Sequence, residues 1–126
     1  MNADILFFFR DHMPALSLYE ALEARILAVI PEVTIKVSKT QISFSNKYGF
    51  AFVSLIPCRK AANRPESWIT VSFGLDHQKE SVRIDAATEP YPNRWTHHIM
   101  VGSVKEIDDE LVDWICEAAV FSAAKR

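Results

Sequence analysis

Two adjacent histidines, His97 and His98, are the residues of this chain best suited to acid–base or ligand-binding chemistry. They lie in the segment Arg94–Val101, where apolar and polar residues alternate and predict a β-strand. Neighbouring side chains of a strand point to opposite faces, so the two imidazoles cannot bind one metal ion together. We expect His97 to be a buried, hydrogen-bonded core residue. His98 should lie on the polar face of the sheet, where it is the better functional candidate.

Arg83 is the second candidate, because it lies in the short apolar stretch Val82–Ala86, which predicts a strand whose Arg83 side chain points away from the core. A guanidinium and an imidazole among hydroxyl groups are typical of a carboxylate or phosphate site. We therefore expect an anion-binding site centred on Arg83 and His98. The alternative is a solvated sheet face with a contact between Arg83 and Asp85.

Further polar residues should share the face of Arg83 and His98 if the strands align by their apolar positions. Gln41 would join the candidate ligand site, and Lys39, at a hairpin tip, lies close enough along the chain to join it too. The same face should also collect Lys36, Ser43, Thr70, Ser72 and Asp85.

Other catalytic arrangements have little support. Cys58 and Cys116 lie far apart and have no histidine near them in the sequence, which disfavours a zinc site or a cysteine nucleophile. The chain has only 3 glycines, too few for a phosphate-binding loop or a nucleophile elbow. The carboxylates from Asp108 to Asp113 are explained by helix capping. We expect no cofactor and no metal, and we favour a protein without catalytic activity.

The elements that must position these residues follow from periodicity. Ser17-x-x-Glu20 has the form of a capping box, and the spacing after it predicts an amphipathic helix over Ser17–Ile30. A short helix, capped by Asn2 or Asp4, should run up to His12. The period then changes to that of strands. We expect strands over Val33–Ser38, Thr40–Ser45, Phe50–Ile56, Trp68–Leu75, Val82–Ala86 and Arg94–Val101, with loops at 57–66 and 90–93.

The end of the chain predicts a second long helix, over Ile107–Ala124, with an apolar stripe that includes Leu111 and Trp114. Short turns rather than helical crossovers join the predicted strands, so the sheet should be mainly antiparallel. The expected fold is α+β: one antiparallel sheet of five or six strands, packed by N-terminal and C-terminal helices, as a single domain over residues 1–126.

Composition limits the class of protein. The chain has 126 residues, of which 49% are hydrophobic and 24% charged, with a net charge of −2. These values are typical of a folded globular domain and disfavour a general nucleic-acid coat. The apolar run Ile5–Phe9 is too short for a signal sequence or a membrane span. Two cysteines without a disulfide framework favour free thiols, and hence the cytoplasm.

Six segments along the chain form a recognisable series: Leu18–Leu22, Val37–Phe44, Gly49–Phe52, Ser81–Ile84, Arg94–His98, and Ile107–Leu111 with Trp114. Together these segments resemble a bacterial family of domains of unknown function, the 5655 family. The resemblance spans nearly the whole chain and implies the fold, but it implies no activity. A tryptophan-bearing strand followed by an acidic-capped helix also resembles, more remotely, the YjbR-type, frataxin-like fold.

The last helix departs from the pattern of this family. Related chains usually have charged residues where this chain has Val112, Cys116 and Val120, and the small residues Ala119 and Ala123 lie nearby. Small residues would let two helices approach closely, so this stripe predicts a homodimer through the C-terminal helix. The alternative is that the phenylalanine-rich N-terminal segment covers the stripe.

A loop with basic residues, Arg59, Lys60 and Arg64, followed by Trp68, allows nucleic-acid binding as a weaker alternative. Single-strand binders usually place several aromatic residues on an exposed sheet face, where this chain has serine and threonine. Our leading expectation is therefore a small cytoplasmic binding or adaptor domain. The runner-up is an anionic small-molecule site, or an enzyme, centred on Arg83 and His98.

Overall fold

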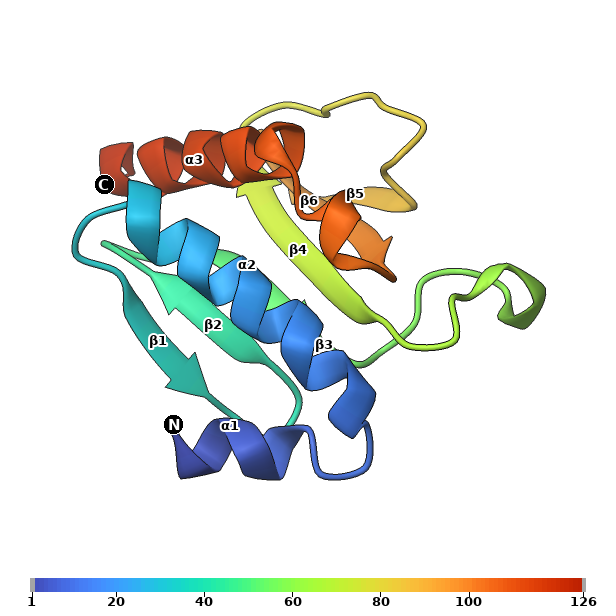
Figure 1. Ribbon diagram of the computed structural model, residues 1–126. Coiled ribbons are helices and arrows are strands. Elements are labelled where there is room, and N and C mark those ends of the chain that lie inside the picture. The colour runs from blue at the N-terminus through green and yellow to red at the C-terminus, as the bar shows by residue number, and fades with distance from the viewer. Residues whose placement is uncertain (1, 126) are drawn as a thin grey trace.

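The computed structural model describes residues 2–125 and has one antiparallel sheet of six strands in the order β1-β2-β3-β4-β6-β5. The strands are β1 (Thr34–Val37), β2 (Ile42–Ser45), β3 (Gly49–Ser54), β4 (Ile69–Leu75), β5 (Ala86–Tyr91) and β6 (Arg94–Val101). The α-helices are α1 (Ala3–Phe8), α2 (Leu16–Val29) and α3 (Asp109–Ala124), and three 3-10 turns lie at Met13–Ala15, Ala61–Asn63 and Val104–Glu106. The predicted α+β class is confirmed (Figure 1).

The two long helices lie on the same face of the sheet (Figure 1). Tyr19 of α2 stacks on Phe44 of β2 with 6.1 Å between ring centroids. Trp114 of α3 stacks on Phe73 of β4 at 5.9 Å. Because the helices bury this face, the alternate residues of each central strand point to the opposite face. We call that opposite side the open face.

The side chains of β4 alternate between the two faces of the sheet as predicted, although nearly all of them are buried. Ile69, Val71 and Phe73 are fully buried under the helices, as the apolar positions of an amphipathic strand should be. Thr70 and Ser72 point to the open face, although they too are buried. The centre of the open face is therefore shielded from solvent, and the candidate site lies there.

Helix α2 begins differently from the prediction. Its N-cap is Ala15, and a 3-10 turn leads directly into Leu16. Ser17 therefore lies inside the first turn, where its hydroxyl donates a weak hydrogen bond of 3.4 Å to the carbonyl of Pro14. The expected capping box is wrong, because the preceding turn already supplies the entry into the helix. Val29 ends the apolar spacing Leu18, Leu22, Ile26 that predicts this helix, but its side chain is 55% exposed.

The strand expected over Val82–Ala86 is also wrong. Residues before Ala86 form turns, and the edge strand β5 runs instead from Ala86 to Tyr91. An edge strand tolerates Pro90, because only one side of it must donate to a neighbour. Val82 is fully exposed, so its apolar side chain does not mark a buried position of a strand.

The start and end of α3 are fixed by polar contacts. Asp108 is the N-cap, and its carboxylate accepts a hydrogen bond from the backbone N–H of Leu111 at 3.1 Å. At the other end, Ser122 donates to Asn46 at 2.7 Å, which ties the turn between β2 and β3 to the helix. The helix begins two residues later than predicted, because Asp108 caps it.

Helix α1 ends at Phe8, earlier than the expected His12, and Asn2 caps it by accepting from the N–H of Asp4 at 2.8 Å. It packs against β1 rather than α3 (Figure 1). The phenylalanine-rich segment therefore does not cover the apolar stripe of α3. No helix within residues 2–125 has the length and apolar character needed to span a bilayer.

Candidate binding site on the open face of the sheet

A cavity of about 480 Å³ lies on the open face, above the central strands. Its floor comes from β3, β4 and β6, and the segment just after β3 forms one wall. The lining residues are Thr40, Gln41, Phe52, Ser54, Ile56, Pro57, Cys58, Thr70, Ser72, Thr96 and His98. The sheet therefore brings together His98 and Gln41, two of the predicted ligand-binding residues.

His98 and Ser72 form the polar centre of the floor. They are register partners on β6 and β4, and the Ser72 Oγ lies 2.7 Å from the His98 Nδ1. Directly opposite residues of an antiparallel pair have side chains on the same face, so this contact follows from the register. Burial lowers the pKa of His98 below its ordinary value, so the imidazole is neutral at pH 7.

The wall of the cavity is held by contacts distant in sequence. Thr70 Oγ1 donates to the carbonyl oxygen of Ile56 at 2.7 Å. The backbone N–H of Cys58 points at the sulfur of Met100 at 3.3 Å. Arg59 pairs with Asp85 at 2.8 Å. These contacts fix residues 56–58 over the sheet, so the wall is part of the folded structure.

The cavity lining carries no formal charge at pH 7. Its polar groups are hydroxyls, the Gln41 amide, the neutral His98 and the Cys58 thiol. Burial, reinforced by the Asp85 carboxylate, raises the pKa of Cys58, so the sulfur stays protonated. Phe52, Ile56 and Pro57 supply apolar surface. The arrangement suits an uncharged ligand with both polar and apolar parts.

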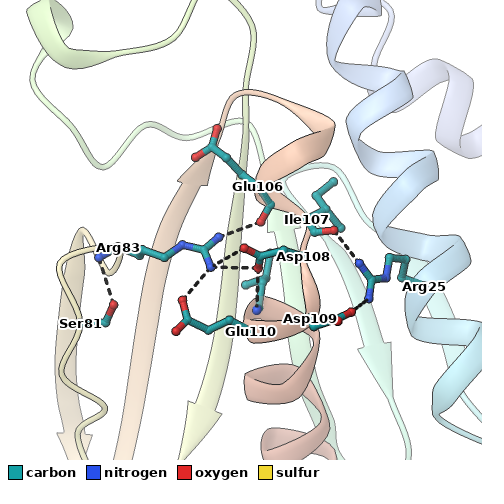
Figure 2. Close-up of polar contacts among 9 residues, drawn as sticks. Arg25, Ser81, Arg83, Glu106, Ile107, Asp108, Asp109 and Glu110 are labelled. Carbon is teal, nitrogen blue, oxygen red and sulfur yellow. Dashed lines mark hydrogen bonds and ion pairs between the residues drawn. The ribbon is translucent and has the colours of Figure 1, made fainter.

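Arg83 does not join this cavity, which corrects the expected pairing with His98. Its guanidinium donates to Asp108 at 2.9 Å, to Glu110 at 2.8 Å and to the carbonyl of Glu106 at 2.7 Å (Figure 2). It also lies over the ring of Trp114, with 5.6 Å to the centroid. Arg83 is a clamp between the loop before β5 and the start of α3.

The contacts of Arg83 also shift the pKa values of the groups involved. Burial alone would lower the pKa of Arg83, but its hydrogen bonds to Glu110 and Asp108 outweigh burial and raise it. The pKa of Asp108 is lowered, because the Leu111 N–H and Arg83 together outweigh its desolvation. Arg25 makes a similar contact from α2, to the carbonyl of Ile107 and to Asp109 (Figure 2). The contact between Arg83 and Asp85, which was the alternative from the sequence, does not form, since Asp85 pairs with Arg59 instead.

Lys39 lies outside the cavity that Gln41 and His98 share. It lines a separate hollow of about 480 Å³ with α1 and the end of β1, including Asp4 and Phe8. Lys39 and Gln41 are close in sequence, but the chain turns between them. Of the four predicted ligand-binding residues, the cavity therefore includes two.

His97 is a buried, hydrogen-bonded core residue, as predicted. It is fully buried, stacks on Phe73 with 4.9 Å between ring centroids, and accepts a hydrogen bond from the backbone N–H of Lys79 at 2.8 Å. Burial lowers its pKa, with a smaller opposing effect from the carbonyl of Phe73. The neutral imidazole thereby fixes the loop after β4.

The predicted interface stripe on α3 divides into two parts. Val112 and Ala119 are buried within the chain, whereas Val120 is 71% exposed. Cys116 and Val120 line two hollows of about 620 Å³ each, one on either side of them. They form a crest between the hollows, and Ala123 lines the hollow nearer α2. We call Cys116 and Val120 the α3 ridge.

The basic loop offers less to nucleic acid than its sequence indicates. Arg59 is paired with Asp85, and the indole nitrogen of Trp68 is buried with no hydrogen-bond partner among residues 2–125. Lys60 and Arg64 are exposed. Within residues 2–125, no group of three or more histidine, cysteine or carboxylate side chains is arranged to bind a metal.

Sequence reasoning missed the wall at Ile56–Cys58 and the aromatic floor at Phe52. The wall depends on a contact between Ile56 and Thr70, 14 positions apart, which no local pattern encodes. One signal was present: in the apolar run Phe50–Ile56, alternation assigns Phe52 to the otherwise polar face. An apolar residue there marks a partly covered floor.

Comparison with known proteins gives one match. A family model described as Domain of unknown function (DUF5655) matches residues 8–122. No curated protein and no solved structure matches. The match supports the family resemblance found in the sequence, whereas the more remote resemblance to the YjbR-type, frataxin-like fold has no support.

Proposed function

The chain belongs to the DUF5655 family of domains of unknown function, and from its cavity we propose that it is a non-catalytic binding module for an uncharged small molecule. One observation carries the proposal: a cavity of about 480 Å³ whose lining mixes hydroxyls, an amide and apolar surface without a formal charge. Small-molecule sites usually have volumes of about 300–1,000 Å³. Size and chemistry therefore both suit a small organic ligand.

A neutral ligand fits better than the anion expected from the sequence. A buried anion needs a cation to offset its lost hydration. Two arginines could supply such a cation, but both are already paired. Arg59 pairs with Asp85, and Arg83 pairs with Asp108. The neutral His98 supplies a hydrogen bond but no charge. An uncharged ligand needs no compensating cation.

Binding also fits better than catalysis. The contact between Ser72 and His98 resembles a nucleophile beside its base. Acyl transfer further requires hydrogen-bond donors for the developing oxyanion. Both residues lie in the middle of paired strands, where backbone N–H groups bond to neighbouring strands. The pair is therefore better suited to holding a ligand than to attacking one.

The proposal is tested by titrating neutral and anionic fragments into isotope-labelled protein and following amide chemical shifts. We expect neutral fragments to perturb β3, β4 and β6 around the cavity. Thr96→Trp should fill the cavity and abolish these shifts. Thr34→Trp, on the same face but at β1, is the matched control and should leave them intact. Failure of every fragment to perturb the cavity would overturn the proposal.

A second candidate, self-association through the α3 ridge, has its own support. Val120 is 71% exposed, and the hollows beside the ridge would receive the ridge of a second copy. Charge favours the same partner. Asp113 and Glu117 line one hollow, where Glu117 already pairs with Lys79, and Lys47 lines the other together with Glu32. A two-fold axis perpendicular to α3 would make the two helices antiparallel and bring Asp113 of one copy towards Lys47 of the other.

Light scattering tests this homodimer. The wild type should be dimeric, and its dimer should weaken as salt rises, because surface charges are screened. Val120→Lys should give a monomer. Val82→Lys makes the same change at another exposed valine, on the loop before β5, and should remain dimeric. A wild type that is monomeric at every concentration would end the idea.

Two further points complete the proposal. Nucleic-acid binding remains the weakest alternative, supported only by the exposed Lys60 and Arg64, and a mobility-shift assay at stated salt tests it. We propose a cytoplasmic location, which is supported by the two free thiols Cys58 and Cys116 because a reducing compartment keeps thiols free.

A further inference from the structure

Among the described residues that line the cavity, His98 alone can carry a positive charge. The other lining groups are hydroxyls, an amide, a thiol and apolar side chains, and none of them takes up a proton between about pH 5 and pH 8. An imidazole does so in this range. The net charge of the lining is therefore either zero or plus one, and the protonation of His98 decides which.

The contact with Ser72 accommodates both states of the ring. The Ser72 Oγ lies 2.7 Å from the Nδ1 of His98. In the neutral ring, Nδ1 can accept a hydrogen bond from the hydroxyl. In the protonated ring both nitrogens are donors, so Nδ1 donates to the serine oxygen and Nε2 carries an N–H. Protonation therefore reverses the direction of this hydrogen bond without breaking it.

The second ring nitrogen, Nε2, is open to a ligand. Within residues 2–125, Ser72 is the one hydrogen-bond partner of the His98 ring, and it contacts Nδ1. In the same part of the chain, Trp68 Nε1 is the one buried side-chain nitrogen or oxygen without a partner. The Nε2 atom is therefore not buried, and since His98 lines the cavity, a ligand there can reach it.

The charged groups next to the cavity do not compensate a protonated His98. Its register partners are Ser72 on β4 and Ala86 on β5, and neither is charged. Beside the wall, Arg59 and Asp85 form an ion pair at 2.8 Å whose charges offset each other. The proton on His98 would therefore lack a counter-ion in the empty cavity.

Two further titratable groups lie close to His98, and both are neutral at pH 7. The thiol of Cys58 faces the cavity, and burial raises its pKa. His97 precedes His98 on β6 but lies on the face that the helices cover, and burial lowers its pKa. Neither group supplies a negative charge. A ligand that brings one would stabilise the proton on His98.

From this arrangement we propose that the cavity takes up an organic monoanion together with one proton, which His98 holds. The anionic group meets the N–H of Nε2, and the apolar part of the ligand lies against Phe52, Ile56 and Pro57. The resulting ion pair has no net charge, so it suits the same lining as an uncharged ligand. The inference rests on the proposed function of this cavity and adds a second class of ligand to it.

Benzenesulfonate and benzenesulfonamide are matched probes for this inference. They share a ring and a tetrahedral sulfur group, but the sulfonate is always an anion and the sulfonamide is uncharged at neutral pH. Because the sulfonate binds with one proton, its association constant should rise about tenfold from pH 7.5 to pH 6.5. The constant of the sulfonamide should stay nearly the same. The amide-shift titration already described measures both at constant ionic strength.

This pH window suits the protein. Burial lowers the pKa of the unliganded His98 from its ordinary 6.5, so the free imidazole is mostly neutral at both pH values. Binding of the anion must then bring the proton from solvent, which gives the full tenfold change for one pH unit.

Calorimetry measures the proton without any variant. The heat of sulfonate binding at pH 7 in two buffers of different ionisation enthalpy gives the number of protons taken up. We expect about one proton for the sulfonate and about none for the sulfonamide. By reciprocal linkage, saturating sulfonate should raise the pKa of His98 followed by NMR.

Two histidine variants assign the proton to its residue. His98→Gln keeps a hydrogen-bonding side chain that does not titrate, so it should remove both the pH dependence and the proton uptake. His12→Gln changes an exposed histidine outside the cavity and should keep both.

The possible outcomes separate this inference from the proposed function. If the sulfonamide binds in the cavity but the sulfonate does not bind, or binds without taking up a proton, the inference is overturned and the uncharged-ligand module survives. A proton uptake that His98→Gln retains also overturns the inference, because another group would hold the proton. If neither probe perturbs the cavity at either pH, both proposals are overturned.

Discussion

At the scale of single residues, Arg83 shows how a side chain that looks functional can be structural. Its guanidinium satisfies Asp108, Glu110 and a backbone carbonyl at the start of α3 (Figure 2). A sequence pattern reveals that an arginine is present between apolar residues, but its partners lie more than twenty positions away. The charge of Arg83 therefore stabilises the fold rather than a ligand.

We expect Arg83→Ala to lower the free energy of unfolding by about 1–2 kcal/mol, because it removes several charge-assisted hydrogen bonds to partly exposed carboxylates. Fragment binding in the cavity should not change. Urea denaturation and the fragment titration measure the two effects. Lys60→Ala, at an exposed loop position, is the control and should change neither. Loss of binding in Arg83→Ala would restore the anion site centred on this residue.

The two adjacent histidines predict how stability depends on pH. Burial lowers the pKa of both His97 and His98 from the ordinary 6.5. The unfolded chain therefore takes up protons at a higher pH than the native protein does. Stability should be complete above about pH 6.5 and should fall as the pH drops through the lowered native pKa values.

Urea denaturation at pH 7.5 and pH 5.0 checks this expectation. The double variant His97→Gln/His98→Gln should lose most of the difference between the two conditions, because glutamine does not titrate and can still accept the hydrogen bond from Lys79. An equal loss of stability at pH 5.0 in wild type and variant would mean that other groups cause the acid sensitivity.

At the scale of elements, the loop after β3 determines whether the cavity has a wall. Its far end packs on Gly102, where a Cβ atom would lie 2.5 Å from the ring of Pro65. Proline is rigid, so it cannot yield without moving the loop. Gly74, on β4 at the open face, has its nearest atom at 3.8 Å and therefore has room for a methyl group.

These two glycines give a matched pair of variants. We expect Gly102→Ala to cost about 1–3 kcal/mol of stability by overpacking and to weaken fragment binding. Gly74→Ala should be tolerated, since alanine fits a strand there without a clash. Thermal melts and the fragment titration would check both. Equal effects of the two substitutions would show that Pro65 does not anchor the wall.

Elements with strong periodicity could be predicted from the sequence, and those without it could not. The stripes of α2, apart from Val29, and of α3 bury the expected residues, and the side chains of β4 alternate between the two faces as expected. Val82–Ala86 failed because apolar residues of an exposed loop imitate a strand, and β5 was missed because Pro90 suggested a loop. For the site, alternation found Gln41, Ser72 and His98, but tertiary contacts alone build the wall.

At the scale of the whole molecule, the order of the strands predicts how stability is distributed. Strands β3, β4 and β6 each have neighbours on both sides, whereas β5 is an edge strand with mostly exposed residues. Local opening is easiest where backbone hydrogen bonds face solvent and few apolar side chains are buried.

Hydrogen exchange followed by mass spectrometry should therefore show slow exchange in β3, β4 and β6. It should show fast exchange in β5 and in the loops at 57–66 and 76–85. A cavity ligand should slow exchange at 55–58 without affecting α3. Protection of β5 equal to that of β4 would contradict this distribution.

The helices lie on only one side of the sheet, and this asymmetry has a consequence for assembly. The cavity lies on the open face, and the α3 ridge points to solvent on the side of the sheet that the helices cover. In a dimer formed through the α3 ridges, the two cavity openings would point away from each other. Dimerisation and ligand binding would then use different surfaces, so neither would compete with the other.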